Sequence, residues 1–403
     1  MNKLQILISG ASIAGPAAAL LLARQGHEVT IVERAPSLRP GGQTVDLRGA
    51  GRTVIDRMGL TEATDAQLLD QRGIATVDAR GRRRSALPVE AFDGNGIVSD
   101  REILRGDLAR TIVDAVPQSV EYLWDDTVVA LNERPGGTVV SFEKSADRRF
   151  DLVIGADGLN SAVRRAAFGP DERHLHPIGL RYAWFTATID QDLDDWYLMH
   201  LAPGGRVVSA RPSRTGGRVK AALAVRGSDS VPLRDRESQW RMFDEAFAGV
   251  GWAAPQLLEQ MRDADDWAYA DLAQVRMDRF TTGSVALVGD AGYCPTPLTG
   301  LGTTLALVGA YVLAGEIERS GGRVAQALAE YEQIMRPFVD GAQELPPGGT
   351  AGYAPKSRLM IALSRLTYWS MTRWPVRNLV AAEFAKADGI DLPDYPLVQR
   401  ELS

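Results

Sequence analysis

Several residue types that mark particular protein classes are scarce in this chain of 403 residues. Its only cysteine is Cys294, which excludes an internal disulfide framework and fits a reducing compartment. The four histidines, His27, His174, His176 and His200, show no metal-ligand spacing with cysteine or acids, so we expect no metal site. The net charge of −6 argues against a nucleic-acid partner and against an anionic membrane surface.

Long apolar segments are also missing. The first apolar segment is too short for a signal peptide and runs directly into a glycine turn. The longest apolar stretch, 300–315, is shorter than a membrane span and predicts a buried helix. We therefore expect a cytoplasmic protein with no membrane partner, present as a monomer or homodimer. The length allows a large core, in two domains or in one large one.

The beginning of the chain, 4–34, has the pattern of a βαβ unit. A short apolar run precedes a glycine turn from Gly10 to Gly15, and an Ala/Leu-rich helical segment leads to a second apolar run that ends in Glu33. Gly10 permits the sharp exit from the strand, and Gly15 permits close packing of the helix on the sheet. The free amides at the helix start suit a pyrophosphate, and an acid placed like Glu33 suits ribose hydroxyls.

One position of this turn departs from the Gly-x-Gly-x-x-Gly spacing, because Ser12 stands at the middle glycine. Serine is small and has a hydroxyl donor, so it reduces the space for a phosphate beside the backbone but does not block it. The alternative is an α/β turn without a ligand, but the strand, helix and terminal acid together favour dinucleotide binding. The cofactor-binding residues assigned to this unit are Gly10, Ser12, Ile13, Ala14, Gly15, Glu33 and Arg34.

Two more strand ends carry an acid beside a glycine. Asp157 and Gly158 follow an apolar run at 152–156, and Gly289 and Asp290 follow another at 284–288. For Asp157 alone, an ordinary turn that it caps is the alternative. Acids and glycines at three strand ends are hard to explain unless one long cofactor crosses the sheet edge. A Pro/Gly-rich loop then leads into a helix whose first amides, after residue 300, form another anion or carbonyl site.

The remaining segments predict a second sheet and several helices. Segments within 179–227 alternate or carry β-branched and aromatic residues between glycine turns, which indicates an antiparallel sheet in a second domain. We expect a helix over 99–113 with Arg101 in its first turn, and a helix over 356–373 that packs on both domains. The fold class is therefore α/β, with a Rossmann-like parallel sheet, an inserted antiparallel sheet and a C-terminal bridging helix.

The three strand-end motifs together resemble those of the class A flavoprotein monooxygenases, the family of para-hydroxybenzoate hydroxylase. Residues 151–165 follow the D-x-x-x-G-A-D-G-x-x-S-x-x-R pattern of that family. The resemblance implies that the turn at 10–15 holds the FAD pyrophosphate and that Glu33 binds the adenosine ribose. It also implies that Asp157 belongs to a motif shared between FAD and NAD(P)H, and that Asp290 meets the ribityl chain.

The resemblance assigns further cofactor residues. Arg101 stands in an R-x-x-L-x-x-x-L run that matches the helix arginine reaching the flavin. The stretch 41–47 is similar to the tetracycline-inactivating and polyketide-tailoring members, which implies that Asp46 and Arg48 lie along the flavin and that Arg39 meets NADPH. The loop residues placed beside the isoalloxazine are Pro297, Gly300, Gly302 and Thr303.

The implied activity is that of an FAD-dependent monooxygenase in antibiotic biosynthesis or inactivation. NADPH or NADH is the transient co-substrate, and one oxygen atom from O2 enters an aromatic or polyketide-like molecule through a flavin C4a-hydroperoxide. No side-chain nucleophile is required, so no catalytic residue is assigned. Arg206, Tyr293 and Pro297 are the substrate candidates, with a surface role as the alternative for Arg206 and packing for Tyr293.

Other functions remain open on the same motifs. One is an FAD-dependent reductase or oxidase without oxygen insertion, and another is a flavin-binding protein without turnover. The chain departs from the family pattern at Gly292 and Tyr293, which replace Ala-His, at Leu301 and Thr304, and at Val308-Gly309, which replaces an acidic pair. The expected domains are 1–70, 98–175 and 275–335 for FAD, 71–97 and 176–274 for substrate, and a C-terminal helical segment at 336–403.

Overall fold

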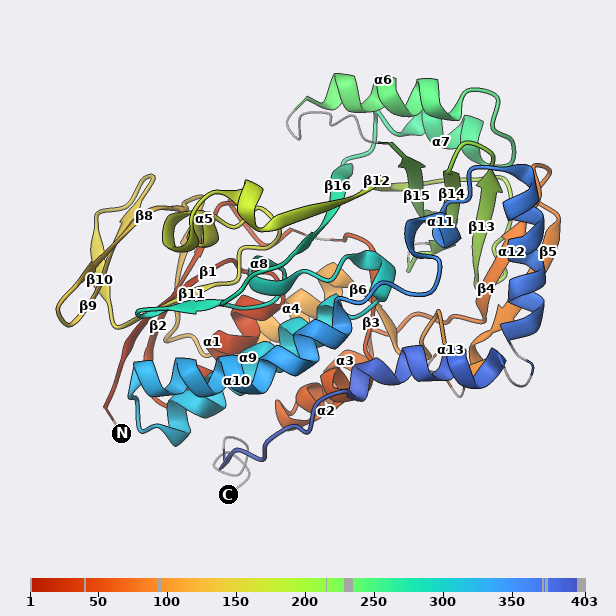
Figure 1. The fold of residues 1–403 in the computed structure, drawn as a ribbon. Coiled ribbons are helices and arrows are strands. Elements are labelled where there is room, and N and C mark those ends of the chain that lie inside the picture. The colour runs from red at the N-terminus through yellow and green to blue at the C-terminus, as the bar shows by residue number, and fades with distance from the viewer. Residues whose placement is uncertain are drawn as a thin grey trace.

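The structure is a computed structural model that describes residues 2–39, 41–92, 94, 96–214, 216–227, 235–371, 373 and 376–396. A parallel sheet with its helices forms one end of the molecule, and an antiparallel sheet forms the other (Figure 1). The C-terminal helices lie at the second end, and the final one leads from there back toward the first (Figure 1). Among the described helices, none combines the length and apolarity needed to cross a bilayer.

The six-stranded sheet has the order β17-β18-β11-β1-β2-β7, and all its pairs are parallel except β17 with β18. Its central strands are almost continuous runs of Val, Ile and Leu because both faces are covered. The strand bounds are β1 Gln5–Ser9, β2 Glu28–Glu33, β7 Glu121–Trp124, β11 Leu152–Gly155, β17 Thr281–Thr282 and β18 Val285–Leu287.

Helices from distant parts of the sequence cover this sheet. Helix α9 (Gly302–Arg319) is buried along nearly its whole length and packs on α1 (Ala14–Arg24), α2 (Gly49–Arg57) and α10 (Val324–Ala342), as its all-round apolar sequence predicts. A small sheet, β8 Val128–Arg134, β9 Gly137–Phe142 and β10 Arg148–Phe150, lies beside α5 (Ala162–Phe168).

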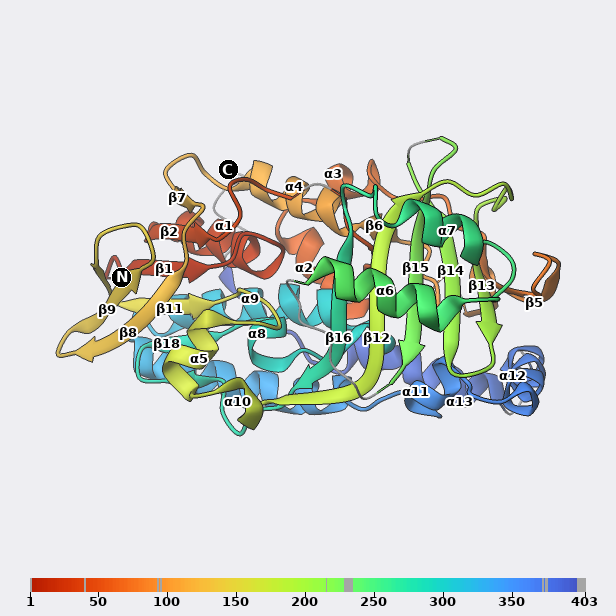
Figure 2. The ribbon, with the colours of Figure 1, turned by 90° about the horizontal axis from the view of Figure 1, so that it is seen from above.

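The seven-stranded sheet has the order β16-β12-β15-β14-β13-β4-β5 and is antiparallel except for the β13–β4 pair. Helices α6 (Arg236–Phe247) and α7 (Ala254–Gln260) cover its outer face (Figure 2). The inner face looks toward the C-terminal helices. The strand bounds are β4 Gly73–Val77, β5 Arg83–Pro88, β12 Leu175–Ala187, β13 Trp196–Ala202, β14 Arg206–Pro212, β15 Val219–Arg226 and β16 Ala268–Val275.

A two-stranded sheet replaces the first turn of one expected helix. Strand β6 (Glu102–Leu104) pairs with β3 (Thr44–Asp46), and α4 begins only at Arg105 and ends at Ala115. The prediction of a helix from 99 was therefore wrong at its start, because strand pairing took the backbone of 102–104. Arg101 consequently precedes the helix and does not stand on it.

The C-terminal segment contains α11 (Gly349–Tyr353), α12 (Arg358–Met371) and α13 (Val376–Phe384). Helix α12 packs on β5, β13 and α13, with Ile361 buried on its inner side. The sequence analysis expected this helix to pack on both domains, but Leu359, Leu363 and Leu366 are exposed and pack on neither. The other elements are α3 Thr61–Asp65, α8 Asp290–Tyr293 and the 3-10 turns Val89–Phe92, Asp171–Arg173, Pro297–Thr299 and Ala385–Asp388.

Candidate active site at the ends of the parallel strands

The glycine turn after β1 brings two strand ends into contact. Gly10 has φ +108°, and a Cβ at this position would lie 3.0 Å from Asp157 Cα at the end of β11. Only glycine fits that geometry. The amide of Gly10 donates to Val32 O at 2.8 Å, which fixes the turn against β2. In the described chain no side chain caps the first amides of α1, so they remain suited to an anion.

Glu33 closes the same turn from β2. One carboxylate oxygen accepts from the amide of Ala11 at 2.9 Å, and the other accepts from the amide of Ala35 at 2.9 Å. The carboxylate is thereby held beside the glycine turn, where the ribose role assigned to it requires it. Arg34 is exposed just after β2, and Ile13 and Ala14 are buried at the start of α1.

An arginine that the sequence analysis missed reaches this turn. Arg105, the first residue of α4, donates from Nη1 to Ser12 Oγ at 2.9 Å. Burial and the nearby charge of Arg39 lower the pKa of Arg105, while the charge of Glu33 raises it. Arg39, which is exposed, and Arg105 thus place positive charge at the α1 N-terminus, as a pyrophosphate site requires.

Arg101 has a different partner. Its guanidinium forms an ion pair with Asp65, and its amide donates to Ser99 Oγ at 3.1 Å. Arg105 fits the first part of that pattern, since Leu108 follows it by three residues, but Ile112 stands where the last leucine would be. The full pattern therefore selected Arg101, whereas the start of α4 puts Arg105 at the glycine turn.

Asp46 and Arg48 connect the first domain to the glycine loop after β18. Their side chains lie 3.2 Å apart, and Arg48 is buried while donating to Ile97 O at 3.0 Å. Thr304 Oγ1, in the first turn of α9, donates to Arg48 O at 3.3 Å. Asp46 also accepts from the Ser99 amide at 2.9 Å. The contacts place both residues beside the start of α9.

The carboxylate of Asp157 accepts hydrogen bonds from protein groups. Ser161 Oγ donates to it at 2.5 Å, and the amides of Ala162 and Val163 donate at 2.8 and 3.3 Å. These bonds correspond to the alternative in which Asp157 caps the following helix. The fully buried Arg164 donates to Ala291 O at 2.9 Å, so the end of this pattern ties one strand-end motif to the next.

Asp290 differs from the other two acids because its side chain is accessible to solvent while lying recessed among protein atoms. Desolvation raises its pKa, and a hydrogen bond with Cys294 opposes that shift. Burial raises the pKa of the Cys294 thiol well above its ordinary value, so the cysteine is not a reactive thiolate. A recessed, accessible carboxylate at a strand end is a suitable partner for a cofactor hydroxyl.

The loop from Asp290 to α9 is held in an uncommon conformation. Thr296 has φ +79°, which is rare for a β-branched residue, and its Oγ1 accepts from the Leu298 amide at 3.1 Å. Pro297 is exposed, and Gly300, Gly302 and Thr303 are partly buried. Within the described residues no side chain caps the first amides of α9, so Gly302 and Thr303 present donors at this edge.

Tyr293 does not line this edge. It is 1% exposed, and its hydroxyl lies 2.9 Å from that of Tyr331, which donates to Leu287 O at 2.8 Å. The ring packs edge-on against Phe280 at a centroid distance of 5.3 Å. The structure therefore gives Tyr293 the packing alternative and not the substrate role.

Side chains along β14 alternate between the two faces of the sheet, which places two of its arginines on opposite faces. Val208 and Ala210 pack in the core under α6 and α7, whereas Val207 packs on the inner face. Arg206 has the parity of the outer face, and it donates to Pro203 O at 2.6 Å and to Ala246 O at 2.9 Å. Its substrate assignment is not supported by these contacts. Arg211 has the opposite parity.

Arg211 lies on the inner face, next to the first domain. It donates to Thr44 Oγ1 at 2.8 Å, forms an ion pair with Glu102, and sits 3.8 Å over the ring centroid of Tyr197. Burial lowers the pKa of Arg211, and the charge of Asp46 raises it. Glu102 is fully buried, and among the described residues its second oxygen, Oε2, has no hydrogen-bond partner.

Tyrosine hydroxyls gather on the same face. Tyr182 Oη lies 2.8 Å from Tyr353 Oη of α11, and the Tyr182 ring stacks on Trp184 at 4.6 Å. Leu298, from the loop before α9, packs against the same group of residues. The inner face is therefore aromatic, carries a partly buried cation, and adjoins the loop at the parallel strand ends. The sequence analysis missed Arg105, Arg211, Glu102 and Tyr353, although strand alternation was available to find Arg211. It gave no role to Arg164, the last residue of the pattern that begins at Asp151.

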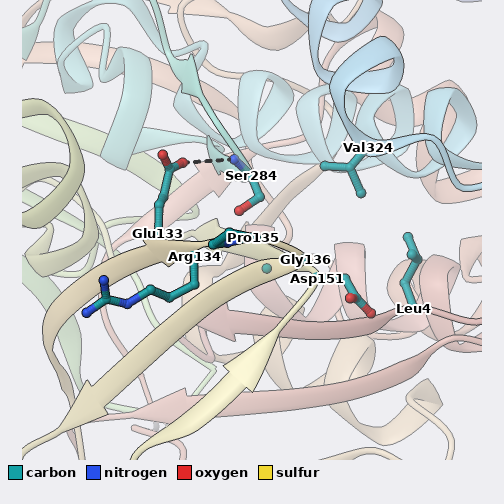
Figure 3. A pocket seen from close by; sticks show the side chains of 9 residues that line it. Leu4, Glu133, Arg134, Pro135, Gly136, Asp151, Ser284 and Val324 are labelled. Carbon is teal, nitrogen blue, oxygen red and sulfur yellow. Dashed lines mark hydrogen bonds between the residues drawn. The ribbon is translucent and has the colours of Figure 1, made fainter.

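A surface hollow lies at the opposite edge of the parallel sheet (Figure 3). It is lined by Leu4, Asp151 and Ser284, which precede β1, β11 and β18. Glu133 Oε1 accepts from the Ser284 amide across it at 3.3 Å. Open parallel sheets bind ligands outside the carboxyl ends of their strands, so we assign no cofactor to this hollow.

Comparison with known proteins agrees with the geometry. Residues 3–344 match the FAD binding domain family. An uncharacterized protein of Mycobacterium tuberculosis, Rv1260, is 41% identical, with 87% of this chain and 94% of that protein covered. The FAD-dependent monooxygenase asL6 of Sarocladium schorii is 33% identical over 98% and 99% of the two chains. The crystal structure of tetracycline destructase Tet(55) has a TM-score of 0.81 and 31% identity, with 98% and 99% covered.

The chain belongs to the FAD-binding family of class A monooxygenases. It is an FAD-dependent monooxygenase with a parallel FAD-binding sheet and an antiparallel substrate sheet. The residues fit the cofactor on structural grounds, because Gly10 lets the ends of β1 and β11 approach closely beside the uncapped start of α1, Arg105 supplies charge there, and Asp290 is accessible at a strand end. The domain boundaries and the residue roles remain predictions.

Proposed function

We propose that this protein uses NAD(P)H as a transient reductant and inserts one oxygen atom from O2 into an aromatic or polyketide-like small molecule. Bound FAD would supply the oxygen-activating chemistry. The protein's part is to bind the cofactor, orient the substrate and exclude water from the reaction. An activity in antibiotic biosynthesis or inactivation is part of the proposal.

The residues at the strand ends would divide the cofactor between them. The turn from Gly10 to Gly15 and Arg105 would hold the pyrophosphate, since amides and a guanidinium converge there. Glu33 would take the adenosine ribose, and Asp290 would take the ribityl hydroxyls. The amides of Gly302 and Thr303, at the start of α9, would stabilise negative charge on the reduced ring. Arg39 remains our candidate for contact with NADPH.

The observation that carries the substrate proposal is the inner face of the seven-stranded sheet. Tyr182, Trp184 and Tyr197 line it with aromatic side chains, and the partly buried Arg211 adds a cation beside the loop at the strand ends. Such a face favours a flat conjugated molecule with an oxygen that can accept from a guanidinium. Tetracycline destructase Tet(55), which is named for a polycyclic compound, supports this size of substrate.

The proposal is tested with the purified, FAD-loaded protein. Under anaerobic conditions NADPH is expected to bleach the flavin absorbance, and in air a panel of polycyclic phenols is expected to stimulate NADPH oxidation. Mass spectrometry under 18O2 should then find one labelled oxygen atom in the product. NADPH consumption with only hydrogen peroxide and no labelled product would instead identify the reductase or oxidase alternative.

A pair of variants connects that assay to the sheet. Arg211→Lys keeps a positive charge but loses the planar stack on Tyr197, so it is expected to raise the KM of an active substrate by about tenfold or more. Arg206→Lys is the matched control, because it lies on the same strand with the opposite parity. Equal effects of the two changes would contradict a substrate-facing role for the inner face.

A further inference from the structure

The outer side of α12 presents a row of leucines to solvent. Leu359, Leu363 and Leu366 are 71, 53 and 57% exposed, and their i, i+4, i+7 spacing puts them on one line along the helix. We call these three residues the leucine stripe. Met360, beside it, is 39% exposed, whereas Ile361 on the opposite side is 8% exposed. Large apolar side chains therefore lie on the exposed side of this helix, where an amphipathic surface helix usually carries polar ones.

The helix that carries the stripe is fixed to the fold. Its inner side packs on β5 and β13, and it contacts α13. Just before the helix, Lys356 O accepts from the Gly204 amide in the β13–β14 turn at 2.7 Å. Figures 1 and 2 show α12 at the far end of the molecule from the parallel sheet. The stripe is consequently displayed outward at one end of the protein.

The segment of the chain that carries the stripe contains cations and no acid. Between Glu344 and Glu383 the sequence contains no acid, although acids make up 51 of the 403 residues, or about one in eight. The same interval holds five cations, at Lys356, Arg358, Arg365, Arg373 and Arg377. Lys356 and Arg358 are exposed at the start of α12, adjacent to Leu359. A basic and apolar surface thus stands on a chain whose net charge is −6.

We propose that the leucine stripe and the cations beside it dock this protein on an anionic lipid interface. Leucine side chains enter the boundary between headgroups and acyl chains, and lysine and arginine are attracted to anionic headgroups. The negative charge of the rest of the chain repels the same interface, so docking is confined to this end. The net charge of the whole chain argued against a membrane surface because a sum over all residues does not show this local cluster of cations.

The same features disfavour a second copy of the chain as the occupant. Two copies paired through this face would bring their cations together, which is repulsive. A stable dimer interface buries about 800 Å² on each partner, more than one row of leucines supplies. An anionic lipid surface matches both the charge and the narrow apolar strip.

The test is sedimentation of the FAD-loaded full chain with vesicles. Vesicles of phosphatidylcholine containing about 30% phosphatidylglycerol are expected to bind the protein at least about tenfold more tightly than pure phosphatidylcholine vesicles. Raising the salt concentration should weaken the binding, because headgroup attraction is screened. The flavin absorbance and thermal midpoint of each variant report whether it is folded.

Two variants and a matched control separate the contributions. The triple change Leu359→Ser, Leu363→Ser, Leu366→Ser is expected to reduce binding at least about tenfold. Lys356→Glu with Arg358→Glu should remove the preference for phosphatidylglycerol while leaving the stripe intact. The control is Val129→Ser on β8, since Val129 is 60% exposed at the other end of the molecule and should not affect binding.

The proposal is overturned by three results. One is equal sedimentation with both vesicle types. A second is binding that neither the triple change nor the charge reversal weakens. The third is a concentration-dependent dimer, seen by light scattering, that the triple change dissociates while no vesicles are bound, because a second copy then covers the stripe.

Discussion

The hydroxyl of Tyr293 occupies the space in which a side chain on Gly309 would lie. A Cβ built on Gly309 would overlap Tyr293 Oη and come within 3.2 Å of Val288 Cγ1. Two departures from the family pattern, one in the loop after β18 and one in α9, are thus a single packing arrangement. The larger residue after Gly289-Asp290 is accommodated by the glycine in the helix that passes behind it.

This arrangement predicts a stability change of unusual sign. Gly309→Ala in a helix interior would ordinarily stabilise by about 0.5–1 kcal/mol, but overpacking against Tyr293 is expected to reduce the free energy of unfolding by about 1–3 kcal/mol. Urea unfolding checks this. The double variant Tyr293→Phe, Gly309→Ala should recover part of the loss. A Gly309→Ala protein more stable than the parent would contradict the packing described.

Arg105 is predicted to contribute to FAD affinity. Loss of a charge-assisted contact worth about 1.5–3 kcal/mol should raise the FAD dissociation constant of Arg105→Met by about 10- to 100-fold. Reconstitution of the apoprotein followed by flavin fluorescence measures this constant. Arg101→Met is the control, since Arg101 pairs with Asp65, and it should leave the constant nearly unchanged. The reverse ranking would restore Arg101 to the flavin site.

The ion pair of the partly exposed Arg211 with the fully buried Glu102 predicts that stability depends strongly on keeping both partners. Arg211→Met leaves the fully buried Glu102 carboxylate without its cation, which should lower the free energy of unfolding by about 3–5 kcal/mol. The double variant Glu102→Gln, Arg211→Met removes the uncompensated charge and should be more stable than Arg211→Met alone. Calorimetry or urea unfolding tests the order, and a double variant less stable than the single one would refute it.

Asp290 predicts a pH effect on the apoprotein. Its pKa is raised in the folded state by desolvation, so the folded state favours the protonated carboxyl. Asp290 therefore contributes most favourably to the free energy of unfolding below the pKa that its carboxyl has in the unfolded chain. This contribution is lost as the pH rises through the pKa of the folded state. Asp290→Asn should therefore raise the thermal midpoint of the apoprotein at pH 7 more than at pH 4, while weakening FAD binding. A gain that is larger at pH 4 would have the wrong sign.

The sequence by itself determined the dinucleotide unit and the class of fold. Gly10, Glu33 and the apolar strand between 284 and 288 are local signals, since turn geometry and continuous apolar runs depend on neighbouring residues. Tertiary structure decided which of several candidate residues contacts a given partner. Strand pairing of 102–104 moved the helix start, so Arg105 and not Arg101 contacts Ser12.

Register and packing decided the rest. One strand carries both Arg206 and Arg211, and only the covering of one face by α6 and α7 distinguishes them. The sequence made Tyr293 a substrate candidate, because it does not show that α9 places Gly309 behind the tyrosine ring. The leucines of α12 have a helical period that predicts an amphipathic helix but not which side is covered, because that depends on β5 and β13, distant in sequence. Local geometry is encoded by neighbours, whereas the direction of a side chain is set by what the whole fold packs against it.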